Sequence, residues 1–317
     1  MQVLFYDIRV VKNMHRVGLV VPTLNAGDMW PAWLAAVIGQ NYPLHRKLVV
    51  DSSSTDNTIQ LAQANGFEVL TIARIEFNHG ATRQMAAEYL SDCDLIVFLT
   101  QDAILAQYDA IERLVSVFKH ADISLSYGRQ LPHSNAKLIG AHARLFNYST
   151  HSQIKGKSDI PRLGIKTTFC SDSFACYRRT DLMAIGGFKR DLIFGEDAQI
   201  AARLVLANKK IAYVAQALVY HSHDYTLAQD FKRYFDIGVF HAQETEIFSQ
   251  FGSVSGEGLR FVKSELRYVC QKRQFLLVFS VIIRTFAKYA AYKVGRYERL
   301  LPLSLKRVLS MHRGYWV

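Results

Sequence analysis

The chain has 317 residues, of which 50% are hydrophobic, and a formal net charge of +11. This length and apolar content fit a globular protein with a substantial core, built as one large domain or as a domain with an appendage. Residues 255–317 hold 13 Lys and Arg against 3 Asp and Glu, so the preceding 254 residues carry only +1, which excludes a generally basic body.

The cysteines show no metal-binding pattern. Cys93, Cys170, Cys176 and Cys270 lack CxxC or Cys/His ligand spacing, so a zinc site is not indicated. No secretory signal peptide opens the chain, and we expect a reduced, cytosolic protein. The longest apolar run near the end, residues 275–283, is shorter than the roughly 20 residues that a membrane-spanning helix needs.

The first part of the chain alternates strand-like and helix-like segments. The pattern predicts strands at residues 17–21, 47–50, 67–72 and 95–99, and helices at residues 30–40, 59–65 and 81–90. Such alternation is typical of an α/β fold with a mostly parallel central sheet and helices on both faces, as in Rossmann-like domains. Residues 1–15 leave two interpretations open, an edge strand or a wrongly assigned start.

The second part begins with a polar segment. Residues 144–161 are rich in Ser, Lys and His and predict a mobile loop that could cover a site. We then expect a strand at 167–177, a helix at 181–185, a glycine turn at 186–188, a helix at 198–207 and a strand at 211–220. From Phe231 the pattern is helical and basic, which predicts a main domain over residues 1–230 and a helical extension over residues 231–317.

Two buried strands of the predicted sheet each end in a carboxylate, Asp51 and Asp102. Ligands of open α/β sheets bind beyond the carboxyl ends of the strands, so we expect both acids to face one crevice. The alternative is that each acid only caps the helix that follows it.

Further polar groups follow the later elements. Glu196 and Asp197 precede a predicted helix, where a carboxylate either stabilises the first turn through the helix dipole or acts as a general base. His221 and His223 follow the last predicted strand. Together with Asp102 they could bind a divalent cation, Mg²⁺ or Mn²⁺, that neutralises a phosphorylated ligand.

The order of these motifs resembles the inverting family 2 glycosyltransferases, which have the A-type nucleotide-sugar-binding fold. The matching segments are Val20-Val-Pro-Thr-Leu-Asn25, Val49-Val-Asp-Ser-Ser-Ser-Thr-Asp56, the strand that ends at Asp102, and Phe194-Gly-Glu-Asp197 with the following Arg203. The family's strand-end Asp-x-Asp motif is Thr100-Gln101-Asp102 here, so its first acid is missing, and His221 or His223 could contribute to the metal site instead.

The resemblance implies a role for each matching residue. Asp197 would deprotonate the acceptor hydroxyl, with Glu196 as the alternative base, and Asp102 would bind the metal. Asp51 would bind the base or ribose of the nucleotide. The other residues expected to contact the substrate are Pro22, Thr23, Asn25, Ser53, Gly80, Arg83 and Gln101.

Within that family, Asn78-His-Gly-Ala-Thr-Arg-Gln84 and Leu99-Thr-Gln-Asp-Ala103 are similar to bacterial rhamnosyltransferases that use dTDP-L-rhamnose. Arg83 would face the nucleotide or brace its acids, and Gly80 would let the backbone approach the ligand. The implied reaction moves L-rhamnose onto a hydroxyl of a lipid-linked glycan acceptor with inversion, in the synthesis of a bacterial surface polysaccharide such as O-antigen.

The basic C-terminal region interleaves Lys and Arg with large apolar residues and ends near Trp316. This composition predicts peripheral attachment to the cytoplasmic face of the membrane, where the acceptor lies. A helical cap on the core or a contact in a homo-oligomer is the alternative.

Two other classes of protein fit the sequence less well. Nucleic-acid binding is not expected, because no binding module or aromatic stacking platform is evident. A sugar-phosphate nucleotidyltransferase would carry a basic, glycine-rich loop after its first strand, whereas residues 22–27 contain one glycine and no Lys or Arg.

Overall fold

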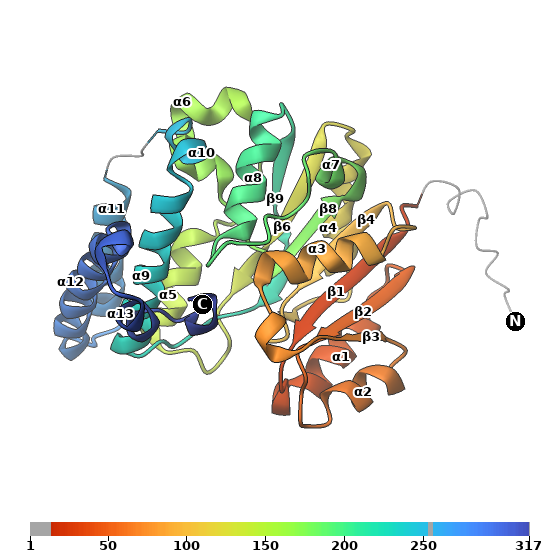
Figure 1. The fold of residues 1–317 in the computed structure, drawn as a ribbon, viewed down its shortest axis with the longest axis horizontal. Helices are drawn as coiled ribbons and strands as arrows, with labels where there is room; N and C mark the ends of the chain where they lie inside the picture. Colours follow the sequence, from red (N-terminus) through yellow and green to blue (C-terminus); the bar gives the residue numbers. More distant parts are fainter. Residues whose placement is uncertain (1–13, 253–255, 317) are drawn as a thin grey trace, which may run out of the picture.

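The computed structural model describes residues 14–252 and 256–316, so the two interpretations of residues 1–15 fall almost entirely outside the described part. In it, nine strands form one mixed sheet in the order β3-β2-β1-β4-β8-β6-β9-β5, with β7 also paired to β9 (Figure 1). The strands are β1 (Val17–Thr23), β2 (Arg46–Asp51), β3 (Glu68–Thr71), β4 (Leu95–Leu99), β5 (Ile104–Leu105), β6 (Ile123–Leu131), β7 (Gln153–Lys155), β8 (Phe174–Arg178) and β9 (Lys210–Tyr220).

Most of the sheet is parallel. Strands β3, β2, β1 and β4 pair in parallel, β8 runs antiparallel to both β4 and β6, and β9 pairs in parallel with β6. Strands β1, β2, β3, β4, β6 and β9 therefore point the same way, and their carboxyl ends meet at one edge of the sheet. The predicted α/β fold with a mostly parallel sheet is confirmed.

Helices cover both faces of the sheet because its strands are apolar on both sides. Along β4, Ile96 and Phe98 face one core and Leu95, Val97 and Leu99 face the other, as the two-residue period of a strand requires. Helices α1 (Trp30–Ile38), α2 (Thr58–Ala64) and α4 (Ala110–Val115) cover the second face. The first face is covered by α3 (His79–Tyr89), α7 (Arg179–Ala184) and α8 (Glu196–Leu206).

A group of helices follows the sheet. It contains α9 (Leu227–Gln243), α10 (Thr245–Ser249), α11 (Glu257–Gln271), α12 (Leu276–Arg296) and α13 (Leu303–Leu309), so the predicted C-terminal helices are present (Figure 1). Phe235, Val239 and Phe240 of α9 belong to the core of the first face. The proposed domain boundary after residue 230 falls inside α9, and the division into two domains stays a prediction.

Helices α9 and α12 cross at two glycines. A Cβ on Gly295 would lie 2.1 Å from the carbonyl oxygen of Phe235, and one on Gly238 would lie 2.3 Å from the carbonyl oxygen of Tyr292. Neither position has room for a side chain, so the backbones approach closely at this crossing. This close contact packs α12 against α9, which itself contributes side chains to the core of the first face.

The predicted mobile loop at residues 144–161 is wrong. The segment contains the end of α5 (Leu138–Asn147), strand β7 and the start of α6 (Ile160–Leu163). Its polar residues bond within the protein: the buried Lys155 donates through Nζ to the carbonyl of Phe169 at 2.6 Å and to the Tyr127 hydroxyl at 3.2 Å. These bonds replace the solvent contacts that its composition indicated.

The strand predicted at residues 167–177 is also mostly wrong. Only residues 174–177 lie in β8, and residues 164–168 form a 3₁₀ helix. The intervening turn places Asp172 where the Tyr177 hydroxyl donates to its Oδ1 atom at 2.5 Å. The remaining predicted strands and helices agree with the structure to within about three residues at each end.

Candidate active site

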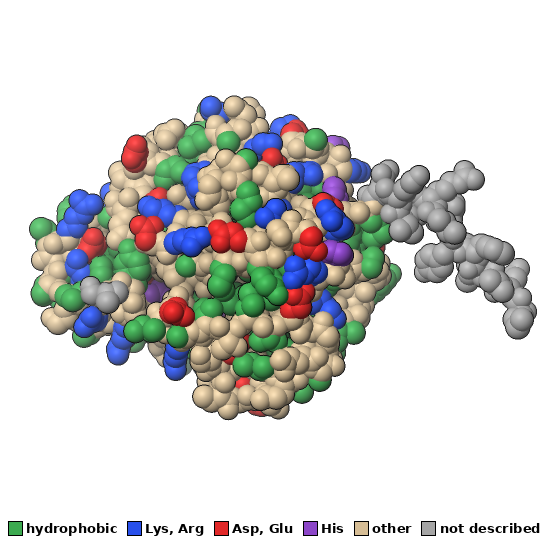
Figure 2. Space-filling view, turned by 45° about the vertical axis from the view of Figure 1, so that its right-hand side comes forward, with side chains coloured by type: hydrophobic (Ala, Val, Ile, Leu, Met, Phe, Trp, Pro, Cys, Tyr) green, Lys and Arg blue, Asp and Glu red, His purple; other side chains and the backbone are tan. Residues whose placement is uncertain are grey.

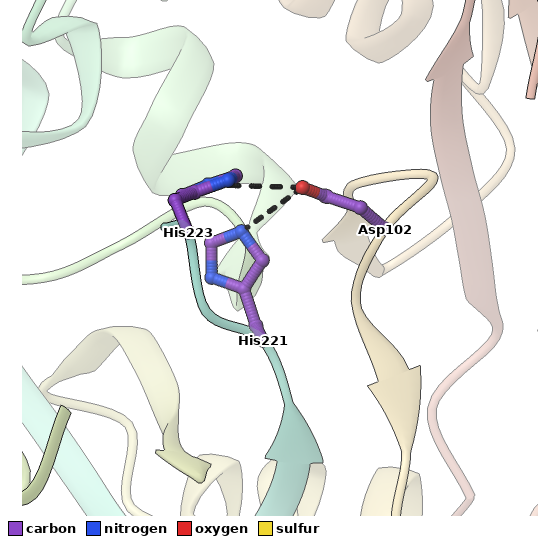
Figure 3. Close-up of side chains that lie close together, drawn as sticks. All are labelled: Asp102, His221 and His223. Atoms are coloured by element: carbon purple, nitrogen blue, oxygen red, sulfur yellow. Dashed lines mark ion pairs between the residues drawn. The ribbon is translucent and has the colours of Figure 1, made fainter. Parts of the chain in front are cut away.

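Asp102, His221 and His223 lie together at the carboxyl edge of the sheet (Figure 3). Asp102 lies in the turn between β4 and β5, and both histidines follow β9. The Asp102 Oδ2 atom is 3.4 Å from His221 Nε2 and 3.7 Å from His223 Nε2, and the potential ligand atoms of all three residues lie within 4.8 Å of one another. One carboxylate and two imidazoles at this spacing can bind a divalent cation.

The surroundings of this cluster determine the orientation and the protonation states of its three side chains. His221 Nδ1 lies 2.9 Å from the Oε1 atom of Gln130, and this contact orients the ring so that Nε2 faces Asp102. Burial lowers the pKa of His221, and it lowers that of His223 to about 4, so both rings are neutral near pH 7. Burial opposes the ionisation of Asp102, but His221 and then His223 hold its pKa well below the usual range. The cluster therefore offers three ligands in the protonation states that a metal needs.

A second cluster surrounds Arg83 of α3. Its Nε atom is 3.0 Å from Asp172 Oδ2, and its Nη1 atom is 2.6 Å from Glu196 Oε1. All three side chains are buried. The helix dipole of α8 and the Arg83 charge both stabilise the Glu196 carboxylate. Arg83 thus braces Asp172 and Glu196, and its expected contact with the nucleotide stays a prediction.

These neighbours give Glu196 and Asp197 different properties. Burial opposes the ionisation of Glu196, but the Arg83 guanidinium outweighs it and keeps the pKa of Glu196 below its usual value. Within the described part of the chain no cation lies within 4.0 Å of Asp197, and burial together with the charges of Glu196 and Asp172 raises its pKa to about 8. A carboxylate with a raised pKa near neutral pH is suited to accept a proton, so this contrast favours Asp197 over Glu196 as a base.

The residues after β1 and β2 form one hydrogen-bonded unit. Asp51 is completely buried, and its carboxylate accepts from Thr23 Oγ1 at 2.8 Å, from the Ser54 amide at 2.7 Å and from Ser54 Oγ at 2.6 Å. The Asn25 amide also donates to Ser54 Oγ. Asp51 thus holds the loop, and its expected contact with the nucleoside stays a prediction.

Three other predicted residues of this region, Gln101, Asn25 and Ser53, contribute to the backbone structure of the loops. Gln101 accepts from the Leu24 amide at 2.8 Å and donates to the Leu24 carbonyl, which ties the ends of β1 and β4 together. Asn25 and Ser53 have positive φ angles of 45° and 63°, a conformation that is uncommon for residues with a side chain and is found preferentially at functional sites.

A cavity of about 980 Å³ opens at these strand ends, and we call it the strand-end cavity. The predicted residues Pro22, Thr23, Gln101 and Arg83 line it. Asp51, Asp102 and Asp197 do not line it themselves. Asp51 bonds to Thr23, Asp102 follows Gln101, and Asp197 follows Glu196, the partner of Arg83. Asp51 and Asp102 therefore lie one bond or one residue behind the wall of this cavity, and Asp197 lies one residue beyond the ion-pair partner of Arg83.

A second cavity of about 910 Å³ lies between α5, α9, α11 and α12, and we call it the helical cavity. His223, Asp224 and Tyr225 line one end of it, and Leu277, Ser280 and Arg284 of α12 line another part. Since Gln101 lines the strand-end cavity and His223 lines the helical cavity, the Asp102 cluster stands where the two cavities approach each other.

The end of the described chain returns to the site. Met311, His312, Arg313, Gly314 and Tyr315 line the strand-end cavity, although they are more than 200 residues from Pro22 and Gln101. Asp236 of α9 accepts from the Met311 amide at 2.9 Å and from the His312 amide at 3.3 Å, and the His312 ring lies 5.4 Å from that of His79. Trp316, expected at the membrane, is instead buried against Phe235.

Gly80 has a packing role. A Cβ at this position would lie 2.0 Å from the carbonyl oxygen of Lys189, so the segment after α7 occupies the space beside it. This contact accounts for the glycine without a ligand, and the expected approach of a ligand to Gly80 stays a prediction.

Sequence reasoning missed Asp172 and His312. Asp172 lies in the segment that was expected to be a strand, and its partner Arg83 is 89 residues away, so no local spacing could reveal the pair. The only signal for His312 is its place in a short polar stretch after an apolar helix, which is also typical of an ordinary chain end.

Comparison with known proteins bears on the family of the chain. Residues 19–186 match the model of the family described as glycosyl transferase family 2. The chain belongs to glycosyltransferase family 2. The predicted family and enzyme class are thereby confirmed, and neither rival class is supported by this match.

Two relatives of this family 2 chain cover nearly its whole length. It is 45% identical over 302 residues to "O-antigen chain rhamnosyltransferase RfbN" of Salmonella typhimurium, covering 95% of this chain and 96% of the relative. It is 46% identical over 299 residues to "O-antigen chain rhamnosyltransferase WbaN" of Salmonella anatum, covering 94% and 95%.

Solved structures support the fold alone. The mannosyltransferase PcManGT from Pyrobaculum calidifontis, solved in complex with GDP-Man and Mn²⁺, is 15% identical with a TM-score of 0.60, covering 91% of this chain and 89% of that one. S. aureus TarS 1-349 is 14% identical with a TM-score of 0.52, covering 90% and 91%. The likeness of fold therefore covers about nine tenths of the chain.

Proposed function

We propose that this family 2 glycosyltransferase is an O-antigen chain rhamnosyltransferase that moves L-rhamnose from dTDP-L-rhamnose to a hydroxyl of a lipid-linked glycan, with inversion at the anomeric carbon. The identity of about 45% over nearly the full length of two rhamnosyltransferases is the observation that carries the proposal. The Asn78–Gln84 and Leu99–Ala103 segments, which prompted the rhamnose assignment, border the strand-end cavity.

The strand-end cavity is the proposed donor site. Pro22 and Thr23 would contact the nucleoside, with Asp51, Asn25 and Ser53 holding the loop around it. Gln101 would fix the relation between this loop and Asp102. A rigid, hydrogen-bonded loop of this kind loses little conformational entropy when the nucleotide binds.

The Asp102 cluster is the proposed metal site. Asp102, His221 and His223 supply the mixed oxygen and nitrogen ligands that Mn²⁺ and Mg²⁺ accept, and the Gln130 contact orients His221. A bound cation would neutralise charge on the donor diphosphate. Two imidazoles beside a single carboxylate would compensate for Thr100 at the position of the missing acid.

Asp197 is the proposed base. Its carboxylate would take the proton of the acceptor hydroxyl as that oxygen attacks the anomeric carbon and the bond to the diphosphate breaks. Arg83 and Asp172 would act as positioning residues, because they hold Glu196 and the start of α8 rather than the reacting atoms. No covalent enzyme intermediate is needed.

Peripheral attachment to the cytoplasmic face of the membrane belongs to the same proposal. Helix α12 exposes apolar side chains at a spacing of three and four residues, namely Leu276, Phe279, Ile283 and Phe286, of which Leu276 is 85% and Phe286 71% exposed. The exposed Lys272, Arg273, Lys293 and Arg296 flank this stripe. In Figure 2 the edge of the molecule formed by the C-terminal helices presents hydrophobic and Lys or Arg side chains next to each other.

Apolar side chains inserted below the headgroups and basic side chains level with them are typical of a helix lying in an anionic bilayer surface. Among the described residues, no helix combines the length and the hydropathy needed to cross a bilayer. A homo-oligomer contact on the same face remains the alternative proposal.

A donor screen followed by a transfer assay tests the proposed activity. With Mn²⁺ or Mg²⁺, we expect dTDP-L-rhamnose to raise the melting temperature more than UDP- or GDP-sugars do. With a lipid-linked glycan acceptor, the enzyme should release dTDP and extend the glycan by one rhamnose. Formation of dTTP from dTDP-L-rhamnose and pyrophosphate would contradict the proposal and support a nucleotidyltransferase.

A further inference from the structure

The departing nucleoside diphosphate needs positive charge close to it. Arg83, the cation expected there, is committed elsewhere, because Asp172 and Glu196 lie 3.0 Å and 2.6 Å from its guanidinium and all three side chains are buried. Two carboxylates more than balance its charge. Besides the cation of the proposed metal site, a second positive contact for a diphosphate near the Asp102 cluster would therefore come from another element.

Arg233 of α9 lies between the two clusters. Its guanidinium carbon is 4.8 Å from the centre of the Phe194 ring and 5.6 Å from the centre of the Tyr225 ring. Phe194 precedes Glu196 by two residues, and Tyr225 follows His223 by two residues. Arg233 also lines the helical cavity together with His223 and Tyr225. The side chain thus stands beside the proposed metal site and contacts a ring two residues before Glu196.

Arg233 has a free charge in this position. Among residues 14–252 and 256–316, no carboxylate lies within 4.0 Å of its guanidinium, whereas the neighbouring Arg284 and Lys288 both pair with Asp230. Its influence reaches both sides of the site: burial lowers the pKa values of His223 and His312, and the charge of Arg233 lowers them further.

The aromatic contacts prepare this side chain to bind an anion. Arginine stacks favourably on aromatic faces, and the contacts restrict the guanidinium to few orientations before a ligand arrives. A planar guanidinium can donate two parallel hydrogen bonds to phosphate oxygens, which a lysine ammonium cannot do.

We propose that Arg233 binds the diphosphate of the sugar nucleotide and stabilises it as the leaving group. This inference rests on the proposed function and adds to it a residue outside the motifs of the resemblance. Phe194 and Tyr225 hold the guanidinium, and α9 connects it to the C-terminal segment through Asp236, three residues further along the helix.

Calorimetric binding of dTDP, dTMP and thymidine with Mn²⁺ tests the inference without relying on turnover. Hydrogen bonds to charged groups predict that Arg233→Ala weakens dTDP binding about 10- to 100-fold. Binding of dTMP should change much less, and thymidine binding not at all. Arg233→Lys keeps the charge but loses the paired geometry, so its dTDP affinity should lie between those of the other two proteins.

Lys232→Ala is the matched control. It removes one positive charge from the adjacent position of α9, and Lys232 lines neither cavity. We expect the control to bind dTDP as the wild type does, and a melting curve of each variant checks that α9 is intact.

Three results would overturn the inference. Unchanged dTDP binding with an increased KM for the acceptor would assign Arg233 to the acceptor, and an equal loss for dTDP, dTMP and thymidine would make its role structural. Failure of the wild-type protein to bind dTDP at all would instead overturn the proposed function and this inference with it.

Discussion

At the residue scale, the raised pKa of Asp197 makes the proposed base testable by pH. Burial and the charges of Glu196 and Asp172 bring this pKa to about 8, so much of Asp197 is protonated at neutral pH. Because only the carboxylate accepts a proton, kcat should rise with pH and level off above about 8. A profile of kcat against pH that is flat from pH 6 to 9 would contradict the assignment.

Two substitutions separate Asp197 from Glu196. General-base catalysis is worth roughly 100- to 10,000-fold, so Asp197→Asn should lower kcat by about that factor and leave donor binding intact. Glu196→Gln removes one partner of the buried Arg83 and should chiefly lower the melting temperature, because breaking such a pair is destabilising by about 3–5 kcal/mol. Loss of turnover only in Glu196→Gln, with the donor still bound, would transfer the base role to Glu196.

The metal cluster makes a separate prediction at this scale. His223→Ala removes one of three proposed ligands, so more Mn²⁺ should be needed for half-maximal activity, while EDTA should inactivate the wild type reversibly. His120→Ala is a suitable control because His120 is exposed and precedes β6, at the opposite edge of the sheet from Asp102. An identical metal dependence in both variants would remove His223 from the site.

At the element scale, the crossing of α9 and α12 explains how the C-terminal helices are fixed. Gly295→Ala would place a Cβ 2.1 Å from the Phe235 carbonyl, and overpacking of this kind is destabilising by about 1–3 kcal/mol. A Cβ on Gly258 of α11 would meet no atom of the described residues within 4 Å, so Gly258→Ala should be stabilising by up to about 1 kcal/mol. Thermal unfolding that shifts both variants in the same direction would contradict this account.

Elements differ in how well the sequence predicts them. The buried strands β1, β2 and β4 are continuous apolar runs and were predicted almost to the residue, because burial on both faces leaves an unmistakable pattern. Strand β6 was missed, since Ser124, Ser126 and Gly128 interrupt its apolar run although they are central to the sheet. Residues 144–161 were misread because buried hydrogen bonds, such as those of Lys155, are invisible in composition.

The candidate site divides in the same way. Asp102, His221 and His223 were predicted together because each lies within three residues of the end of a strand, and the carboxyl ends of parallel strands meet. Asp172, Arg233 and His312 reach the site from turns and helices whose positions depend on tertiary packing. No spacing along the chain encodes that packing, so the sequence alone gives no indication of these three residues.

At the scale of the whole molecule, the apolar stripe of α12 predicts binding to anionic vesicles. Phe279→Ser with Phe286→Ser removes two exposed aromatic side chains and should reduce sedimentation with liposomes without lowering the melting temperature. Binding of the wild type should also decrease with salt, as electrostatic attraction to anionic lipids requires. Salt-independent binding, or equal binding of the double variant, would contradict a membrane-facing role for α12.

The return of Met311–Tyr315 to the strand-end cavity has a practical consequence for anyone producing this enzyme. A purification handle or fluorescent fusion attached beyond Trp316 would emerge beside the strand-end cavity. It could obstruct the proposed donor site or displace His312. Strand β1 starts at Val17, at the opposite edge of the sheet from its carboxyl end at Thr23, so a handle on the amino-terminal side is the natural comparison. Comparing KM for the donor between enzymes that carry the same handle at either end would show how strongly the final residues affect donor binding at the strand-end cavity.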